Sequence, residues 1–401
     1  MALGSLFARL RGPRTAPLPD RIDLSARAFE ADLAPLFARL RAERPVAFCT
    51  DGGLLLTRHA DILAALTDRT LGNAPSRFSP LAARNRDKTP AAALAANILP
   101  FQNAPDHVAL RPLASRSFHL ALAGLIDGLD DLADRHLARG HWPGDLIPVA
   151  RGFALEVMRR FTGLPEGPDY KGVTQAFFHL FAPLADRAVF DALNAELGRH
   201  RAAIRQAIPA APDGSLSAAL RDSDVPPEIA ADLVILFFAD GVENIEAGIA
   251  NVIAAMDEPA TWLEALAAGA IGASALVDEG LRLRTPAQII TRVAMSDTLV
   301  AGQAVSAGRP VYLCLASAAR DEAAVPDAGR FDPARDQSAL PVFGRGRHSC
   351  IGAPMARAMI AALLNALARQ GLRPTLPATE LRFLPRFGHQ WPVTYPMISA
   401  R

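Results

Sequence analysis

Residues 343–352 read Phe-Gly-Arg-Gly-Arg-His-Ser-Cys-Ile-Gly and lead into a helical pattern. Pro354 suits the first turn of that helix, and apolar residues follow at helical spacing: Met355, Ala356, Met359, Ile360, Leu363 and Leu364. Cys350 therefore stands at a helix start, where unpaired N–H groups and the helix dipole stabilise a thiolate. Gly344 and Gly346 permit backbone angles that other residues resist, so the loop can wrap closely around the sulfur.

This stretch resembles the cysteine-ligand motif of the cytochrome P450 family, F-G-x-G-x-H-x-C-x-G, at all six specified positions. The resemblance implies that Cys350 binds the iron of haem b and that His348 meets a haem propionate. A thiolate ligand pushes electron density to the iron and favours cleavage of a bound O–O bond. Phe343 would shield the sulfur and Gly352 would leave room for the porphyrin, and we place Arg345 among the cofactor-binding residues. The alternative is a structural cysteine beside a glycine turn.

Two further patterns support this resemblance. Glu279 and Arg282 are three residues apart on one helical face, and Arg330 precedes Phe331; the family suggests a buried Glu279–Arg282–Arg330 cluster that maintains the fold. His107 and Arg111 match the family's H-x-x-x-R, and Arg292 matches a strand arginine, so the three are expected to bind haem propionates. Taken alone, each pair could also be an ordinary surface pair.

The chain of 401 residues is expected to form a single domain, residues 1–401, that is mainly α with small β-sheets and has the cytochrome P450 fold. Residues 1–20 are expected to be a flexible N-terminal segment. Residues 45–58 indicate a hairpin around Asp51-Gly-Gly53. A helix should follow Asp145 and stop at Gly163, and a long helix should begin near Asp224, which can cap it, and end before Pro259.

Composition excludes several other classes of protein. Lys and Arg (42) nearly balance Asp and Glu (41), so no global basic field would attract nucleic acid. The strongest apolar run, residues 233–239, is too short to cross a membrane, and we expect a cytoplasmic protein. Three widely spaced cysteines argue against a disulfide framework or a zinc site, and we interpret Cys49 and Cys314 as buried apolar residues.

The centre of the long helix departs from the family pattern Ala/Gly-Gly-x-Glu/Asp-Thr, because residues 240–244 read Asp-Gly-Val-Glu-Asn. The resemblance implies that Gly241 opens the helix for dioxygen and that Glu243 helps to relay protons. Asn244 replaces the usual threonine but keeps a donor and an acceptor, so we expect it to preserve oxygen activation. Asp240 lies on the same face as Asn244. It either binds a polar substrate group or joins the proton relay, or it is simply capped or solvated.

The substrate pocket is expected to include Phe237, Gly241, Gln288, Ile289 and Ile290, with the turn around Phe387-Gly-His389 as a further candidate. Each of these residues could equally be plain core.

Electrons should come from a separate ferredoxin or flavodoxin and its reductase. Arg345, Arg347 and Arg357 could form the docking patch or be solvated charges. We expect a monomer that binds neither nucleic acid nor membrane.

The sequence thus favours a monooxygenase that inserts one oxygen atom from O2 into a small, largely apolar molecule by hydroxylation, O-demethylation or epoxidation. Two alternatives remain open. The missing threonine would suit peroxide-driven oxidation, and the fold could also serve a non-catalytic haem-binding protein.

Overall fold

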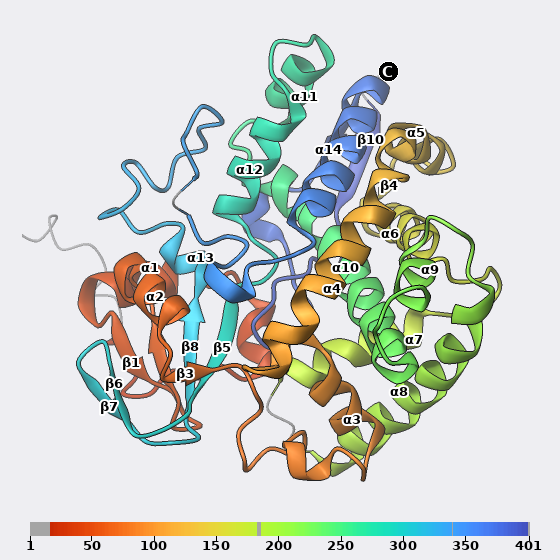
Figure 1. Ribbon diagram of the computed structural model, residues 1–401. Helices are drawn as coiled ribbons and strands as arrows, with labels where there is room; N and C mark the ends of the chain where they lie inside the picture. The colour runs from red at the N-terminus through yellow and green to blue at the C-terminus, as the bar shows by residue number, and fades with distance from the viewer. Residues whose placement is uncertain (1–16, 183–185, 339, 400–401) are drawn as a thin grey trace, which may run out of the picture.

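The computed structural model describes residues 17–182, 186–338 and 340–399. Most of the segment predicted to be flexible, residues 1–16, lies outside the described residues. The fold is mainly helical, as predicted, and Figure 1 shows a large helical part beside a smaller region of strands flanked by α1 and α2. The helices are α1 (Ala34–Glu43), α2 (His59–Thr67), α3 (Pro90–Asn97), α4 (Asp106–Ala123), α5 (Leu129–Ala138), α6 (Leu146–Thr162), α7 (Lys171–Phe177), α8 (Arg187–Ala207), α9 (Leu216–Arg221), α10 (Pro227–Ala255), α11 (Pro259–Ala267), α12 (Ala273–Leu283), α13 (Leu315–Ala318) and α14 (Ala353–Gln370).

The strands form three small sheets. The largest has the order β1-β2-β8-β5-β3, in which β1 and β2 form an antiparallel hairpin, β8 runs parallel to β2, and β5 runs antiparallel to both β8 and β3. The second sheet has the order β4-β10-β9, and β6 pairs with β7. The strands are β1 (Val46–Phe48), β2 (Leu54–Leu56), β3 (Leu71–Gly72), β4 (Gly144–Asp145), β5 (Ile289–Ala294), β6 (Thr298–Val300), β7 (Gln303–Val305), β8 (Pro310–Cys314), β9 (Leu372–Pro374) and β10 (Pro396–Ser399).

Local sequence signals explain several of these elements. The hairpin around residues 51–53 is confirmed. Asp145 caps α6 by accepting a hydrogen bond from the Ile147 N–H, and Gly163 ends the helix with a φ of 74°, which glycine adopts without strain. Cys49 and Cys314 are buried, as expected.

The long helix α10 runs through the centre of the helical part, where it packs against α6, α7, α8, α12 and α14. It spans 29 residues, or about 44 Å, and almost all of its side chains after the first turn are buried. The prediction that Asp224 caps it is wrong. Pro226, whose extended backbone precedes Pro227, occupies the N-cap, and no side chain of the described residues caps this end. Among the residues that the structure describes, no helix is both long and apolar enough to span a membrane.

Candidate functional site

The cysteine loop, residues 343–352, contains a short 3₁₀ helix, η8 (Gly346–His348), and leads directly into α14. The Cys350 N–H donates to the Phe343 carbonyl oxygen at 2.9 Å, which closes the loop. Gly344 and Gly346 have φ values of 68° and 74°, in the left-handed region that the sequence predicted. Gly352 is the N-cap of α14. Cys350 is the exposed cysteine of the three, so it is available to a ligand.

The surroundings of Cys350 do not by themselves ionise the thiol. Although the residue is accessible, its sulfur is surrounded by protein, and this burial raises the pKa of Cys350 to about 12, helped by the charge of Asp240. The N–H groups of Gly352 and Ala353 and the charge of Arg111 lower the pKa, as the helix position predicted, but burial outweighs them. A coordinated metal ion would supply the missing positive charge, because a thiol that binds a metal loses its proton.

Beside the loop lies a basic cluster made of His107, Arg111, Arg292, Arg347 and His348. The rings of His107 and His348 are 3.9 Å apart between centroids. Arg111 donates to the Ser349 carbonyl oxygen at 2.6 Å, and Arg292 donates to the Thr291 carbonyl oxygen at 3.0 Å. Within the part of the chain that the structure describes, none of the five residues forms an ion pair with a carboxylate.

The members of the basic cluster repel one another. Burial, followed by the nearby arginines, lowers the pKa of His107 to about 4. Burial, followed by His107 and Arg292, lowers the pKa of His348 to about 3. Burial and Arg347 lower the pKa of Arg292 to about 10. The buried Nε2 of His107 has no hydrogen-bond partner among the described residues. A buried polar atom without a partner is costly, and the positive charges beside it have no carboxylate among the described residues, so this cluster is suited to receive an anion.

Two further arginines, Arg345 of the loop and Arg357 of α14, differ in their contacts. Arg345 is exposed, and the structure does not bring it into the basic cluster, so its predicted role in cofactor binding gains no support. Arg357 lies over the Phe343 ring, 4.5 Å from its centroid, and its Nε is 2.6 Å from Asp278. Arg357 is therefore neutralised, which leaves Arg345 and Arg347 as the exposed positive charges of this loop.

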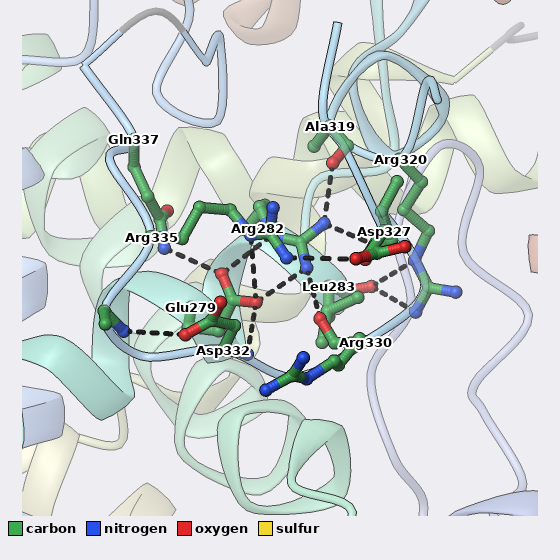
Figure 2. Close-up of polar contacts among 12 residues, drawn as sticks. Glu279, Arg282, Leu283, Ala319, Arg320, Asp327, Arg330, Asp332, Arg335 and Gln337 are labelled. Atoms are coloured by element: carbon green, nitrogen blue, oxygen red, sulfur yellow. Dashed lines mark hydrogen bonds and ion pairs between the residues drawn. The ribbon is translucent and has the colours of Figure 1, made fainter. Parts of the chain in front are cut away.

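The predicted pair of Glu279 and Arg282 on α12 is buried (Figure 2). Arg282 donates from Nε and NH2 to the two carboxylate oxygens of Glu279, both at 2.7 Å. Its NH1 donates to the carbonyl oxygens of Ala319 and Ala328, and its NH2 also donates to that of Arg330. Both charges are thus fully surrounded by partners.

The prediction that the side chain of Arg330 joins this cluster is wrong. Arg330 is exposed, and only its carbonyl oxygen contacts Arg282, as Figure 2 shows. The second guanidinium belongs to Arg335, whose Nε is 3.5 Å from Glu279 Oε1. The Asp332 N–H and the Gln337 amide also donate to Glu279. The connection after Arg330 folds back over α12 and so brings Arg335, rather than Arg330, to the carboxylate.

At the centre of α10, Asp240 and Asn244 lie on one face, as their spacing predicted. Asn244 Nδ2 donates to Asp240 Oδ1 at 2.9 Å. The Asn244 Oδ1 atom is buried and has no hydrogen-bond partner in the described part of the protein. Burial raises the pKa of Asp240 to about 6, and the bond from Asn244 opposes this shift. The pair therefore presents one unused acceptor and one carboxyl group whose pKa lies closer to neutrality than usual.

Glu243 has a partner that sequence reasoning missed. Arg151 of α6 lies between two acidic residues of α10, with its NH2 3.4 Å from Glu243 and its Nε 2.7 Å from Glu246. Burial raises the pKa of Glu246 to about 7, with the charge of Glu243 adding to the effect and Arg151 opposing it. The spacing of Glu243 and Glu246 indicated a shared helix face, but nothing in one sequence identifies the arginine on the opposite helix.

The expected substrate-pocket residues lie in different places. Helix α10 continues unbroken through Gly241, so the expected opening is not seen; a β-carbon there would lie 2.5 Å from the end of the Met158 side chain of α6, and the glycine leaves room for that side chain. Phe237 is buried against Phe118. Gln288 donates to the Thr285 carbonyl oxygen and lines a small polar cavity, described below.

The two isoleucines of β5 face opposite ways. Ile289 is buried in the core around the sheet. Ile290 is half-buried and shares a strand face with Arg292, because side chains alternate along a strand. Of the two, Ile290 therefore lies on the side of the basic cluster.

Comparisons with known proteins agree with this geometry. The family model for cytochrome P450 matches residues 273–370. Cytochrome P450 monooxygenase PikC of Streptomyces venezuelae is 30% identical over 367 residues, which cover 86% of this chain and 85% of PikC. Cytochrome P450 BJ-3 of Bradyrhizobium diazoefficiens is 29% identical, with 88% of this chain and 90% of that protein covered. The solved structure of CYP154C4 from Streptomyces sp. W2061 matches with a TM-score of 0.80 at 26% identity, covering 95% of this chain and 98% of that one.

The chain belongs to the cytochrome P450 family. It is accordingly an oxidoreductase of the monooxygenase class that carries haem and uses O2 and a redox partner. The residues around Cys350 fit this cofactor, because this accessible cysteine adjoins a cluster of cationic and imidazole groups that have no carboxylate partner among the described residues and can therefore receive the propionates of haem.

Proposed function

We propose that this protein uses haem b, bound through Cys350, to insert one atom of O2 into a small, largely apolar substrate. The observation that carries the proposal is the combination of an exposed cysteine at a helix start with the uncompensated basic cluster beside it. When bound, the haem supplies reductive activation of O2, which a thiolate ligand promotes. The hydroxylation, epoxidation and O-demethylation chemistries all suit this assignment.

The residues of the site would divide this work among themselves. Cys350 provides the iron ligand, and the N–H groups of Gly352 and Ala353 partly stabilise its charge. His107, Arg111, Arg292 and His348 bind the propionates. Phe343, held by the cation–π contact with Arg357, covers the cysteine loop and limits the access of water.

Asp240 and Asn244 would handle protons and water on the opposite side of the site. Since Asn244 Nδ2 is committed to Asp240, the free Oδ1 accepts a hydrogen bond from a water molecule or from the substrate. Asp240 then holds a proton at Oδ2 or binds a polar substrate group. Glu243, which directly precedes Asn244 on α10 and is held by Arg151, provides a second carboxylate.

We further propose that the described residues form one domain and that the electrons come from a ferredoxin or flavodoxin with its reductase. Helix α10 packs against helices from both halves of the chain, which supports a single domain. Arg345 and Arg347 are the exposed charges that would attract an acidic redox partner.

The decisive test is the spectrum of the reduced protein with carbon monoxide. We expect the long-wavelength Soret band of a thiolate-bound ferrous adduct in the wild type and in Cys314→Ser, whose cysteine is buried in β8. Cys350→Ser should lose this band. If Cys350→Ser keeps the band, or if no porphyrin can be loaded into the wild type, the proposal fails.

A second test concerns Asn244. In Asn244→Ala, we expect a smaller fraction of reductant to appear in product, because the Oδ1 acceptor and the bond to Asp240 are lost; Asn244→Thr should retain more of this coupling. Unchanged coupling in both variants would remove Asn244 from the mechanism. The peroxygenase alternative would be favoured if product formed from peroxide without a redox partner, while no product formed from O2 with a redox partner.

A further inference from the structure

A small cavity outside the haem site is lined by an unusual number of charged and amide side chains. It lies where the start of α1 meets the connection from α12 to β5 and the turn before Trp391. Its polar lining comprises Asp32, Arg41, Arg284, Gln288, Arg320 and Gln390. The accessible volume of about 10 Å³ is enough for one water molecule or one monatomic ion.

Arg320 is the arginine of this cavity that lacks an acidic partner. Its Nε and NH2 both donate to the Leu283 carbonyl oxygen, at 3.0 and 2.7 Å, and it forms no ion pair within the described chain. Burial lowers the pKa of Arg320 to about 10, with Arg284 adding to the shift and Asp32 opposing it. A buried guanidinium in this position requires a compensating negative charge.

Arg41 has an unused donor at the same place. Only 7% of the Arg41 side chain is exposed. Its NH1 donates to Ser317 and its NH2 reaches Glu322, whose side chain is 69% exposed. The buried Nε has no hydrogen-bond partner among the residues described. This is a polar group that native proteins rarely leave unsatisfied.

The charges around the cavity do not balance. Arg284 pairs with Asp32 at 3.1 Å and Arg41 pairs with Glu322 at 3.3 Å. Three guanidinium groups against two carboxylates leave one positive charge, that of Arg320. Each side-chain amide has already used one N–H, Gln288 on Thr285 and Gln390 on Ala31, and retains a second N–H to donate.

We propose that this cavity binds a small monovalent inorganic anion, with chloride as the natural occupant, between Arg320 and Arg41. The anion satisfies the Arg41 Nε and compensates the charge of Arg320. It also connects α1 to the residues just before β5, the strand that carries Arg292, and to Gln390, whose carbonyl oxygen accepts from Asn251 of α10. The site is therefore placed to stabilise the junction between the strand region and the helical part.

The test is the dependence of the holoprotein's urea unfolding on chloride at constant ionic strength, with gluconate, which is too large for the cavity, as the replacing anion. Above the dissociation constant, each tenfold rise in chloride should increase the ratio of folded to unfolded protein about tenfold. Arg320→Gln should lose this dependence, whereas Arg382→Gln, which changes an exposed arginine, should keep it. Equal chloride dependence in the wild type and Arg320→Gln would overturn the proposal.

A crystallographic measurement covers the case in which Arg320→Gln does not fold. Crystals of the wild type grown or soaked in bromide should show an anomalous peak between Arg320 and Arg41. A cavity that contains only water, with no anomalous peak at that position, would contradict the assignment. Neither experiment depends on activity, so the anion site and the proposed function can fail separately.

Discussion

Two charged regions of this protein differ in how far the polypeptide itself satisfies their charges. The charges of Glu279 and Arg282 both have partners, which come from α12, from Ala319 and from the connection that contains Ala328 and Asp332. In the basic cluster, positive groups face one another, and His107 Nε2 has no partner among the described residues. The first region is complete with the polypeptide alone. The second becomes favourable only when an anionic group enters it, and this incompleteness distinguishes a binding site from a structural cluster.

The largest effect should follow from breaking the complete region. Glu279→Ala leaves the Arg282 guanidinium buried without its carboxylate, which should lower the free energy of unfolding by about 3–5 kcal/mol. The measurement is urea unfolding, or the yield of folded protein where the variant does not accumulate. Arg330→Ala is the matched control and should change stability by less than about 0.5 kcal/mol, because only its carbonyl oxygen contributes. A large loss in Arg330→Ala would contradict the arrangement of Figure 2.

Helix geometry makes part of this cluster predictable from the sequence, and the rest depends on the folded path of the chain. The three-residue spacing of Glu279 and Arg282 follows from helix geometry and was predicted correctly. The choice between Arg330 and Arg335 depends on the path of an irregular connection, which no periodicity encodes. The contact of Gly241 with Met158 has the same cause, because Met158 lies on another helix. Local motifs identified the cysteine loop and the helices, whereas contacts between distant segments needed the structure.

In the basic cluster, a substitution should separate stability from cofactor binding. Arg292→Leu removes a buried charge that only a propionate would compensate. We expect haem to dissociate about 10- to 100-fold faster, corresponding to the loss of a hydrogen bond to a charged group. The free energy of unfolding of the haem-free protein should stay the same or rise by about 1 kcal/mol, since repulsion with Arg347 is relieved. Haem transfer to a scavenging protein and urea unfolding measure the two quantities.

Arg345→Leu is the control for this experiment, because Arg345 is exposed and its charge does not contribute to the pKa shifts of His107, Arg292 or His348. It should leave the rate of haem loss nearly unchanged. If Arg292→Leu lowered the free energy of unfolding of the haem-free protein as much as Glu279→Ala does, the basic cluster would be a structural cluster like that of Glu279 and Arg282.

Glu246 lies between these two cases, because Arg151 is shared between Glu246 and Glu243. The pKa of Glu246, about 7, is higher than the ordinary value of 4.5, so ionisation of Glu246 destabilises the folded state relative to the unfolded state. Stability is therefore lost as pH rises from about 4.5 to 7. Glu246→Gln should be more stable than the wild type by about 1–3 kcal/mol above pH 7 and equal to it near pH 4.5. Glu264→Gln, at an exposed position of α11, should show no such pH-dependent difference. A Glu246→Gln variant less stable than the wild type at pH 8 would mean that the ion pair with Arg151 outweighs burial.

The smallest effect should be on the rate of reduction by a redox partner. It concerns the exposed charges of the cysteine loop, which water and salt screen. Replacing Arg345 and Arg347 together by Gln should slow reduction by a ferredoxin several-fold at low ionic strength, and the difference should shrink as salt screens the charges. Arg357→Gln should change the rate less than twofold, because Asp278 already neutralises Arg357. Stopped-flow reduction at several salt concentrations measures both. If Arg357→Gln had the larger effect, the Asp278 pair would not screen it, and the docking surface would extend along α14 instead of being limited to the cysteine loop.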